Sequence, residues 1–361
     1  MSAAIYYDIY LIVLTIITML VMARYRVHSW KSLEYNSNSG YGFAWIICAI
    51  VVLFVGFRPI SIEFGDTVST EEYYSHIYGD AFFFTLNTDN LFFDNWFAWM
   101  ASKHFDMTTV FLLFAFVYFG VMLIALRRLF PNEVLLAFVV YLVAFSTFSY
   151  GTNGVKAGMA ASVFLLAITY HKKLWLSLLI ALFTFTQHHS MALVIAAYVL
   201  TLFVKNTKYY IVGWLICLLM AILHITYFQF LFAGFTDEQG ASYLLYKDNT
   251  RFRIDFVLYS FVPIAIGYYL VYKKKIPSKG FYNNLLNLYI TTNAVWMLCM
   301  YAEFTNRISY LSWFLYPVVL LYPFIYFDWG HNQRRYLKCV VYLHLGFTLF
   351  MEFIYYGFLH G

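Results

Sequence analysis

The chain has 361 residues, of which 63% are hydrophobic, 23% aromatic and only 11% charged, with a net charge of +5. A soluble domain cannot cover so large an apolar fraction with so few charges. The composition therefore excludes a soluble globular protein and predicts an all-α polytopic membrane protein, with one transmembrane domain over residues 1–361. The excess positive charge follows the membrane topology, and we expect no nucleic-acid partner.

Apolar stretches of helical length recur along the whole chain. Most approach the ~20 residues that cross about 30 Å of hydrocarbon; the fifth and sixth are shorter, as happens where helices end in a polar cavity. The 4 cysteines lie inside these stretches without metal-ligand spacing, so they are expected to be core residues. We expect about twelve transmembrane helices, over residues 5–23, 41–57, 107–126, 134–150, 156–170, 174–187, 190–204, 209–231, 256–272, 284–302, 308–327 and 339–358.

Basic residues in alternate connectors set the orientation. Most of the 23 Lys and Arg residues, including Lys172 and Lys173, fall on one side, which the positive-inside rule makes cytoplasmic. The outer side nevertheless holds cations beside span ends, where charge is costly unless it is paired or hydrated. Cations that come from separate outer connections predict an anion-binding site. These residues are Arg58, Lys103, Lys156, Lys247, Arg251, Arg253 and Arg307.

The first long outer segment covers residues 58–106. It opens with a polar turn broken at Pro59 and Gly65, and it continues into a stretch with aromatic residues at helical spacing, from Phe92 to Met100. That stretch is too short and too polar to span, so we expect an amphipathic helix at the outer membrane interface. Two roles stay open for it, a lid that guides a lipid tail and a plain anchor helix.

The stretch from Tyr150 to Leu193 gathers polar side chains on one face. Two apolar segments stand back to back around the basic turn 171–173. Lys156 lies at the far end of the first segment and the pair His188–His189 at the far end of the second, so all three are expected on the outer side. Adjacent residues face different sides of a helix, so at most one of these histidines points inward. Two interface histidines without a function are the alternative.

Two further outer segments carry candidate residues. The segment 232–255 holds two arginines and tyrosine rings suited to stacking on sugars, although an ordinary hydrated loop is the alternative; the residues are Arg251, Arg253, Tyr243 and Tyr246. In the last outer connection Glu303 and Arg307 lie four residues apart. That spacing favours a pair or two side chains in one cavity.

These residue types suit glycosyl transfer from a donor activated as a pyrophosphate. Arg and Lys stabilise phosphate oxygens, and preorganised cations lower the barrier to the loss of a pyrophosphate. An acceptor sugar hydroxyl benefits from a general base, for which a histidine or a carboxylate is suited. The sequence has no Gly-rich nucleotide loop and no D-x-D or H-E-x-x-H pattern, so we predict neither a metal nor a cofactor.

Four stretches, in this order, resemble the EpsG family of Wzy-like membrane polymerases of capsule and exopolysaccharide synthesis, a class that includes O-antigen-type polymerases. They are GFR…GDT…YY (56–74), YGTNGVKAGMAAS (150–162), QHHSMAL (187–193) and NRISYLSW (306–313). The residues on the family's pattern are Arg58, Asp66, Tyr73, His188, Ser190 and Arg307. The chain departs from it at Lys156, where such proteins carry Arg, because lysine keeps the charge but lacks the bidentate fork.

The resemblance implies a fold related to GT-C-type membrane glycosyltransferases. It also implies a polymerase that joins oligosaccharide repeat units linked to undecaprenyl pyrophosphate on the outer face of the bacterial cytoplasmic (inner) membrane. The expected partners are this lipid-linked oligosaccharide, membrane lipid and a chain-length regulator protein.

A hypothesis for the roles follows from the expected shared face. His188 or Asp66 would serve as the base, and His189 and Glu303 would orient the reacting groups. The residues expected to hold pyrophosphate or substrate are Arg58, Lys156, Arg251, Arg253, Arg307, Tyr73 and Tyr243.

Two other functions stay open. A flippase or exporter of lipid-linked glycans would also have many spans and outer cations, but it should place polar residues at mid-membrane and on both faces. A membrane acyltransferase acting on surface polysaccharide would be expected to present a cytoplasmic site for its soluble donor, and the cytoplasmic connectors are short and merely basic.

Overall fold

The computed structural model describes residues 2–24, 40–233, 242, 251–276, 280–303 and 305–357. Throughout these ranges the secondary structure is helical and contains no strand, which confirms the predicted all-α class. The chain divides into two compact units, a first unit of Met1–Ile180 with Phe324–Gly361 and a second unit of Ala181–Pro323. Each unit is described by itself.

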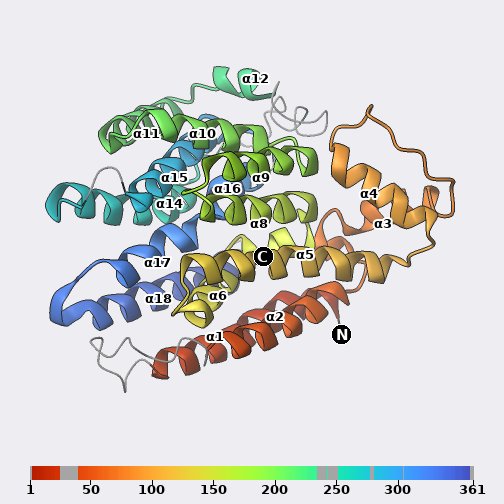
Figure 1. Cartoon of the computed structure of the whole chain (residues 1–361), viewed down its shortest axis with the longest axis horizontal. Coiled ribbons are helices and arrows are strands. Elements are labelled where there is room, and N and C mark those ends of the chain that lie inside the picture. The colour runs from red at the N-terminus through yellow and green to blue at the C-terminus, as the bar shows by residue number, and fades with distance from the viewer. Residues whose placement is uncertain are drawn as a thin grey trace. The chain divides into compact units, whose positions relative to one another are not determined.

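Nine α-helices belong wholly to the described part of the first unit, and Figure 1 shows α2, α5 and α8 lying side by side. They are α1 (Tyr6–Arg24), α2 (Tyr41–Gly56), α3 (Thr67–His76), α4 (Leu91–Ser102), α5 (Met107–Leu129), α6 (Val134–Leu142), α7 (Thr147–Thr152), α8 (Val155–Thr169) and α18 (Gln333–Phe350).

The second unit is built around α15, which packs against α10, α11, α14 and α16. Its helices are α10 (Met191–Phe203), α11 (Thr207–Ile222), α12 (Tyr227–Ala233), α14 (Ile254–Tyr268), α15 (Phe281–Leu298) and α16 (Thr305–Trp313). Two helices contain a boundary between the units, namely α9 (Leu174–Gln187) and α17 (Tyr316–Tyr326).

Apolar helices of membrane-crossing length are present in both units. Within the described residues, 5 helical segments are long and apolar enough to span, which agrees with a polytopic membrane protein. They are Ala3–Ala23, Met107–Leu129, Ile254–Lys273, Thr305–Tyr326 and Gly330–Tyr356. Shorter apolar helices coincide with other expected spans, namely α2, α8, α9, α10 and α11.

The expectation of one helix over residues 134–150 is wrong, because the chain breaks between α6 and α7. The carbonyl groups freed at the break accept hydrogen bonds from side chains. Tyr10 OH donates to Leu142 O (2.9 Å) and Thr348 Oγ1 donates to Val143 O (2.8 Å). An apolar surrounding requires this satisfaction of backbone groups, so α1 and α18 make the break possible.

The expected single helix over residues 209–231 is also wrong. His224 has a φ of 58°, a left-handed conformation that an α-helix cannot continue through. The chain turns there, as the N–H of Ile225 donates to Met220 O (2.9 Å), and α12 begins three residues after His224. The apolar pattern continues across the turn, and for this reason hydropathy alone predicts a single helix where the structure has two.

Buried polar side chains connect the helices of the second unit. Asn293 on α15 accepts a hydrogen bond from Trp214 Nε1 (2.8 Å) on α11 and donates one to Ser312 Oγ (3.0 Å) on α16. All three residues are buried. Because hydrocarbon offers no competing partner for these groups, the network fixes how α11, α15 and α16 pack.

The amphipathic helix expected within residues 58–106 is present as α4, and part of its apolar stripe packs against protein. Phe93 and Phe97 are buried, and their ring centroids lie 5.2 and 6.0 Å from that of Phe114 on α5. The ring centroid of Phe97 also lies 4.8 Å from that of Tyr74 on α3. These contacts hold α4 against α5, a helix that is long and apolar enough to span a membrane.

Candidate active site

Two of the family-like stretches meet at one turn in the first unit. The turn begins at Thr152, the last residue of α7, and continues through Asn153 toward α8. Thr152 O accepts hydrogen bonds from Arg58 Nη2 (3.1 Å) and Thr67 Oγ1 (3.2 Å). Asn153 Oδ1 accepts one from the backbone N–H of Asp66 (3.0 Å). Residues more than 80 positions apart in the sequence are thereby held together by direct hydrogen bonds.

Two glycines allow this close approach. Gly65 has a φ of 56°, and a Cβ there would lie 2.5 Å from side-chain atoms of Asn153. A Cβ on Gly158 would lie 2.5 Å from Tyr150 O. Distances this short are repulsive, so both positions require glycine for the backbone to come this close.

Arg58 lies at the centre of this contact and is only 4% exposed. Its guanidinium donates to Val55 O (3.0 Å) as well as to Thr152 O, and it stacks 3.9 Å from the ring centroid of Phe111. Burial lowers the pKa of Arg58 to about 10, so the group stays protonated at neutral pH. Within the described residues its Nε has no hydrogen-bond partner. Arg58 thus joins the end of α2 to the Thr152–Asn153 turn.

Asp66 and Lys156 lie at the rim of the turn and are half-buried. Lys156 Nζ is 3.4 Å from Asp94 Oδ1 on α4 and 5.0 Å from the ring centroid of Phe93. The two charged side chains keep 42% and 29% of their surface exposed, so the pair is solvated and weak. An anionic ligand at Lys156 would have to compete with Asp94.

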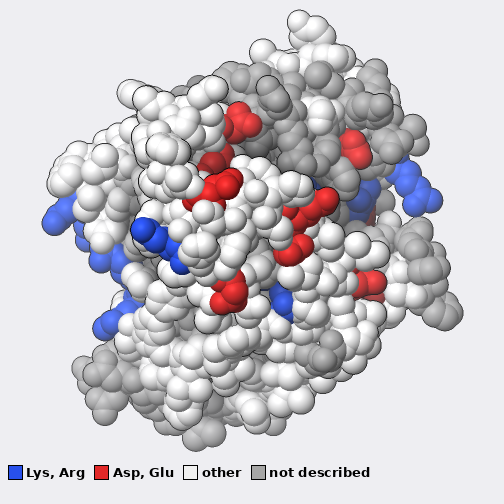
Figure 2. Space-filling view, turned by 90° about the vertical axis from the view of Figure 1, so that its right-hand side faces the viewer, with Lys and Arg blue, Asp and Glu red and all other residues white. Residues whose placement is uncertain are grey.

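The segment 58–106 of the first unit carries many acidic groups. Figure 2 shows the side on which α3 and α4 lie, with red acidic side chains spread over a largely uncharged surface. On this segment Glu63, Glu72 and Asp80 are exposed, as is Tyr73 at 60%. The ring of Tyr73 stacks on Phe97 with centroids 6.2 Å apart, so one of its faces remains available to a ligand.

In the second unit, α10 and α15 run in opposite directions. Lys205, just after α10, contacts the first turn of α15, because Asn283 Nδ2 donates to Lys205 O (3.0 Å) and Lys205 Nζ donates to Asn284 Oδ1 (3.4 Å). At the other end of α15, Trp296 Nε1 donates to Thr305 Oγ1 (2.9 Å) on α16. The start of α10 and the start of α16 therefore lie toward the same end of this unit.

That end holds His188, His189, Glu303 and Arg307, all of them half-buried. His188 Nδ1 lies 2.6 Å from Ser190 Oγ and accepts a hydrogen bond from the Ser190 backbone N–H (3.2 Å). The ring of His189 packs on Phe185 with centroids 4.8 Å apart. As expected for neighbours in sequence, the two histidines make different contacts: His188 contacts Ser190, and His189 packs on Phe185.

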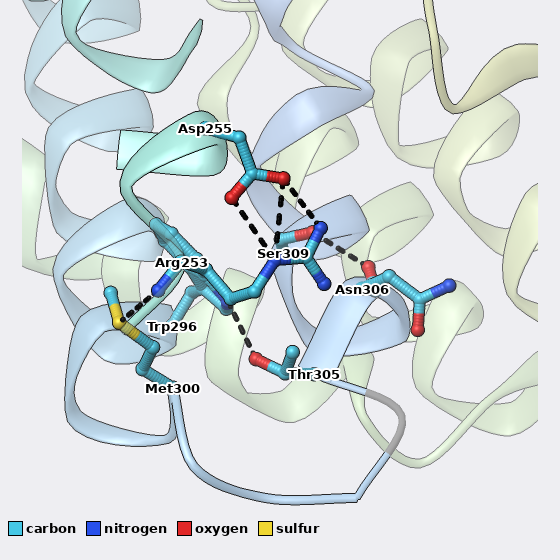
Figure 3. Close-up of polar contacts among 7 residues, drawn as sticks. All are labelled: Arg253, Asp255, Trp296, Met300, Thr305, Asn306 and Ser309. Carbon is cyan, nitrogen blue, oxygen red and sulfur yellow. Dashed lines mark hydrogen bonds and ion pairs between the residues drawn. The ribbon is translucent and has the colours of Figure 1, made fainter. Parts of the chain in front are cut away.

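Arg253 is held in an ion pair at the same end (Figure 3). Its Nη2 lies 2.6 Å from Asp255 Oδ2 and its Nε 3.0 Å from Asp255 Oδ1, with both side chains mostly buried. The guanidinium carbon lies 3.5 Å from the ring centroid of Phe256, and the backbone N–H donates to Met300 Sδ (3.4 Å). The charge of Arg253 is therefore balanced by protein, and this contact joins the start of α14 to the end of α15.

The remaining expected residues differ in their placement. Arg251 is exposed just before α14. Tyr243 lies outside the described residues. Arg307 lies in the first turn of α16, where Ser309 Oγ donates to Asn306 O (2.7 Å, Figure 3).

Sequence reasoning missed three residues that shape these clusters. Asn153 lies inside the quoted YGTNGVKAG stretch, and an asparagine directly before a glycine is itself a signal of a turn whose side chain bonds to nearby backbone. Asp255 follows Arg253 by two positions in RFRID, and its pairing could have been anticipated. Asp94 is the acidic residue of an aromatic stripe, and no local pattern indicated that it would meet Lys156.

Comparison with known proteins gives one family. The model of the EpsG family matches residues 42–359, which is most of the chain. No curated protein and no solved structure matched. The family match covers all four of the stretches that resemble it, including both that meet at the Thr152–Asn153 turn. The chain therefore belongs to the EpsG family, a family of Wzy-like polysaccharide polymerases.

Proposed function

We propose that this polymerase joins oligosaccharide repeat units carried on undecaprenyl pyrophosphate, at the outer face of the bacterial cytoplasmic membrane. The bond between the anomeric carbon and the phosphate oxygen breaks, and the lipid pyrophosphate leaves with the electron pair. The acceptor hydroxyl at the non-reducing end of the incoming unit bonds to that carbon and loses its proton to a base. We also propose that the chain crosses the membrane about twelve times and that its fold is related to that of GT-C-type glycosyltransferases.

One observation carries the proposal. The stretches 56–67 and 151–158 fold onto each other at the Thr152–Asn153 turn, with Arg58 buried between them. A buried arginine held by backbone carbonyls serves to position its neighbours. Asp66, whose backbone is fixed by Asn153, is then suited to act as the base, and Lys156 is suited to contact phosphate.

The second unit, taken by itself, also holds residues of similar chemistry. Arg307 and Arg251 are suited to bind phosphate oxygens, while Arg253 acts as a positioning residue because Asp255 already balances its charge. His189 and Glu303 orient groups at the same end of this unit. Tyr73 on the first unit offers a ring face to a sugar.

Deletion of the chain from its host tests this function. We expect a gel of surface glycan to show single repeat units in place of a ladder, because units are still made and exported but are not joined. Complementation with the wild-type chain should restore the ladder. Complete loss of surface glycan would instead indicate a flippase, and a full-length ladder with altered acylation would indicate an acyltransferase.

A further inference from the structure

A hydrogen bond joins the side chains of His188 and Ser190, and it decides whether the imidazole of His188 can act as a base or as a donor. Both lie in the turn between α9 and α10, and the turn is fixed by backbone hydrogen bonds. The His188 N–H donates to Thr184 O (3.0 Å), and the Met191 N–H donates to His188 O (3.0 Å). The imidazole is therefore held on a defined backbone next to the start of α10.

The contact determines which ring nitrogen carries the proton. A backbone N–H can only donate, so Nδ1, which lies 3.2 Å from the Ser190 nitrogen, must present its lone pair. The Ser190 hydroxyl, 2.6 Å away, then donates to the same atom. A neutral imidazole with its lone pair at Nδ1 carries its proton on Nε2.

We infer that Ser190 is a positioning residue that holds His188 as a neutral Nε2–H donor, which hydrogen-bonds an anionic phosphate oxygen of the lipid-linked substrate and does not act as the general base. A base would need a lone pair directed at the acceptor hydroxyl, and the ring's lone pair is already directed at Ser190. A neutral histidine donor stabilises negative charge on oxygen without transferring its proton. This inference rests on the proposed polymerase function.

The competing use of the same geometry is a nucleophilic serine. A hydroxyl 2.6 Å from an imidazole nitrogen also matches a serine activated by a histidine base. The backbone N–H donates to the same Nδ1 as the hydroxyl, so one lone pair is shared between two donors; this makes it a weaker acceptor for the serine proton and favours the positioning role.

Two substitutions of His188 distinguish a role as hydrogen-bond donor from a role as general base. The amide nitrogen of glutamine reaches about as far as Nε2, whereas that of asparagine reaches only about as far as Nδ1, and neither amide can act as a base. In a polymerisation assay with full-length purified chain and lipid-linked repeat units, we expect H188Q to keep its rate within about tenfold of wild type. H188N should lose about 100-fold, the usual cost of removing one donor to a developing anion. Equal, large losses in both variants would overturn the donor role.

Substitution of Ser190 tests the positioning role. We expect S190A to slow polymerisation and S190T, which keeps the hydroxyl, to restore it. Nitrogen NMR of histidine-labelled protein, assigned with H188Q, should show the Nε2–H tautomer in wild type. S190A removes the closer Ser190 donor (2.6 Å) and keeps the backbone N–H (3.2 Å), so we expect an added Nδ1–H population in that variant. Complete inactivity of S190A with an unchanged tautomer would indicate a nucleophilic serine. A wild-type chain that forms no polymer would refute the proposed function itself, whereas the NMR result would still report on the tautomer.

Discussion

Replacement of Arg58 by alanine is expected to abolish polymer formation. The side chain is 4% exposed and joins α2 to the Thr152–Asn153 turn through carbonyl groups of Val55 and Thr152. Without this side chain, the hydrogen bond that holds the end of α2 to Thr152 is lost, and Asp66 and Asn153 are no longer held in position. A displacement of about 1 Å at a reacting group can cost roughly 100-fold in rate, so we expect at least that loss.

The same substitution should lower stability. Two buried carbonyl groups each lose a charged donor, at about 1.5–3 kcal/mol each, although Thr152 O keeps the Thr67 hydroxyl and Val55 O keeps the backbone N–H of residue 58. Removal of a buried charge returns part of this cost, because burial already lowers the pKa of Arg58 to about 10. We therefore expect a net loss of about 2 kcal/mol, measured as a lower thermal midpoint of the purified protein. R58K should be intermediate, since an ammonium cannot reproduce the guanidinium fork.

Arg127→Ala is the matched control. Like Arg58, Arg127 stacks on an aromatic ring, 3.9 Å from the centroid of Tyr41, and it donates to the hydroxyl of that residue (2.7 Å), but it is exposed. An exposed contact of this kind contributes little. We expect R127A to keep the thermal midpoint and the polymer ladder of wild type. If R58A and R127A behaved alike, Arg58 would not have the central position described for it.

Replacement of Gly65 by alanine is the second large effect that we expect. The φ of Gly65 is 56°, and the added Cβ would lie 2.5 Å from the Asn153 side chain. Strained backbone of this kind costs about 1–3 kcal/mol, and the contact must also move Asn153. Because Asn153 Oδ1 accepts the Asp66 N–H, G65A should reduce polymer length as well as thermal stability.

Gly42→Ala provides the comparison for Gly65. Gly42 lies on α2, its Cβ would meet no atom within 4 Å, and its φ is not in the left-handed region. Alanine there should be neutral or slightly stabilising, because alanine favours helices by about 1 kcal/mol over glycine. Wild-type ladders and midpoints from both variants would mean that the close approach at Gly65 is not required.

Most of the helical layout follows from hydropathy, and the exceptions have local causes. The expected spans over 41–57, 107–126, 156–170 and 174–187 coincide with α2, α5, α8 and α9 to within a few residues. The break after α6 could not be predicted, because it depends on hydroxyl groups of Tyr10 and Thr348 that lie far away in sequence. The end of α11 depends on one backbone conformation, that of His224, within a continuous apolar pattern.

For the candidate site, the sequence indicates which charged and polar residues matter but not which residues they contact in the fold. Arg58 and Arg253 were both expected to hold pyrophosphate because each is a cation beside a span end. The structure balances Arg253 with Asp255 and buries Arg58 against two carbonyl groups. Such roles depend on tertiary contacts. His188 was expected as one of two bases, whereas the tautomer argument needs the position of the Ser190 N–H, which spacing does not provide.

The most direct test of the polymerase function is a reconstitution. The purified full-length chain would be placed in lipid bilayers with undecaprenyl-pyrophosphate-linked repeat units and without nucleotide sugars. The account predicts a product ladder that grows by whole repeat units, present with wild-type protein and absent with R58A. Repeat units that stay single when incubated with folded wild-type protein would contradict it.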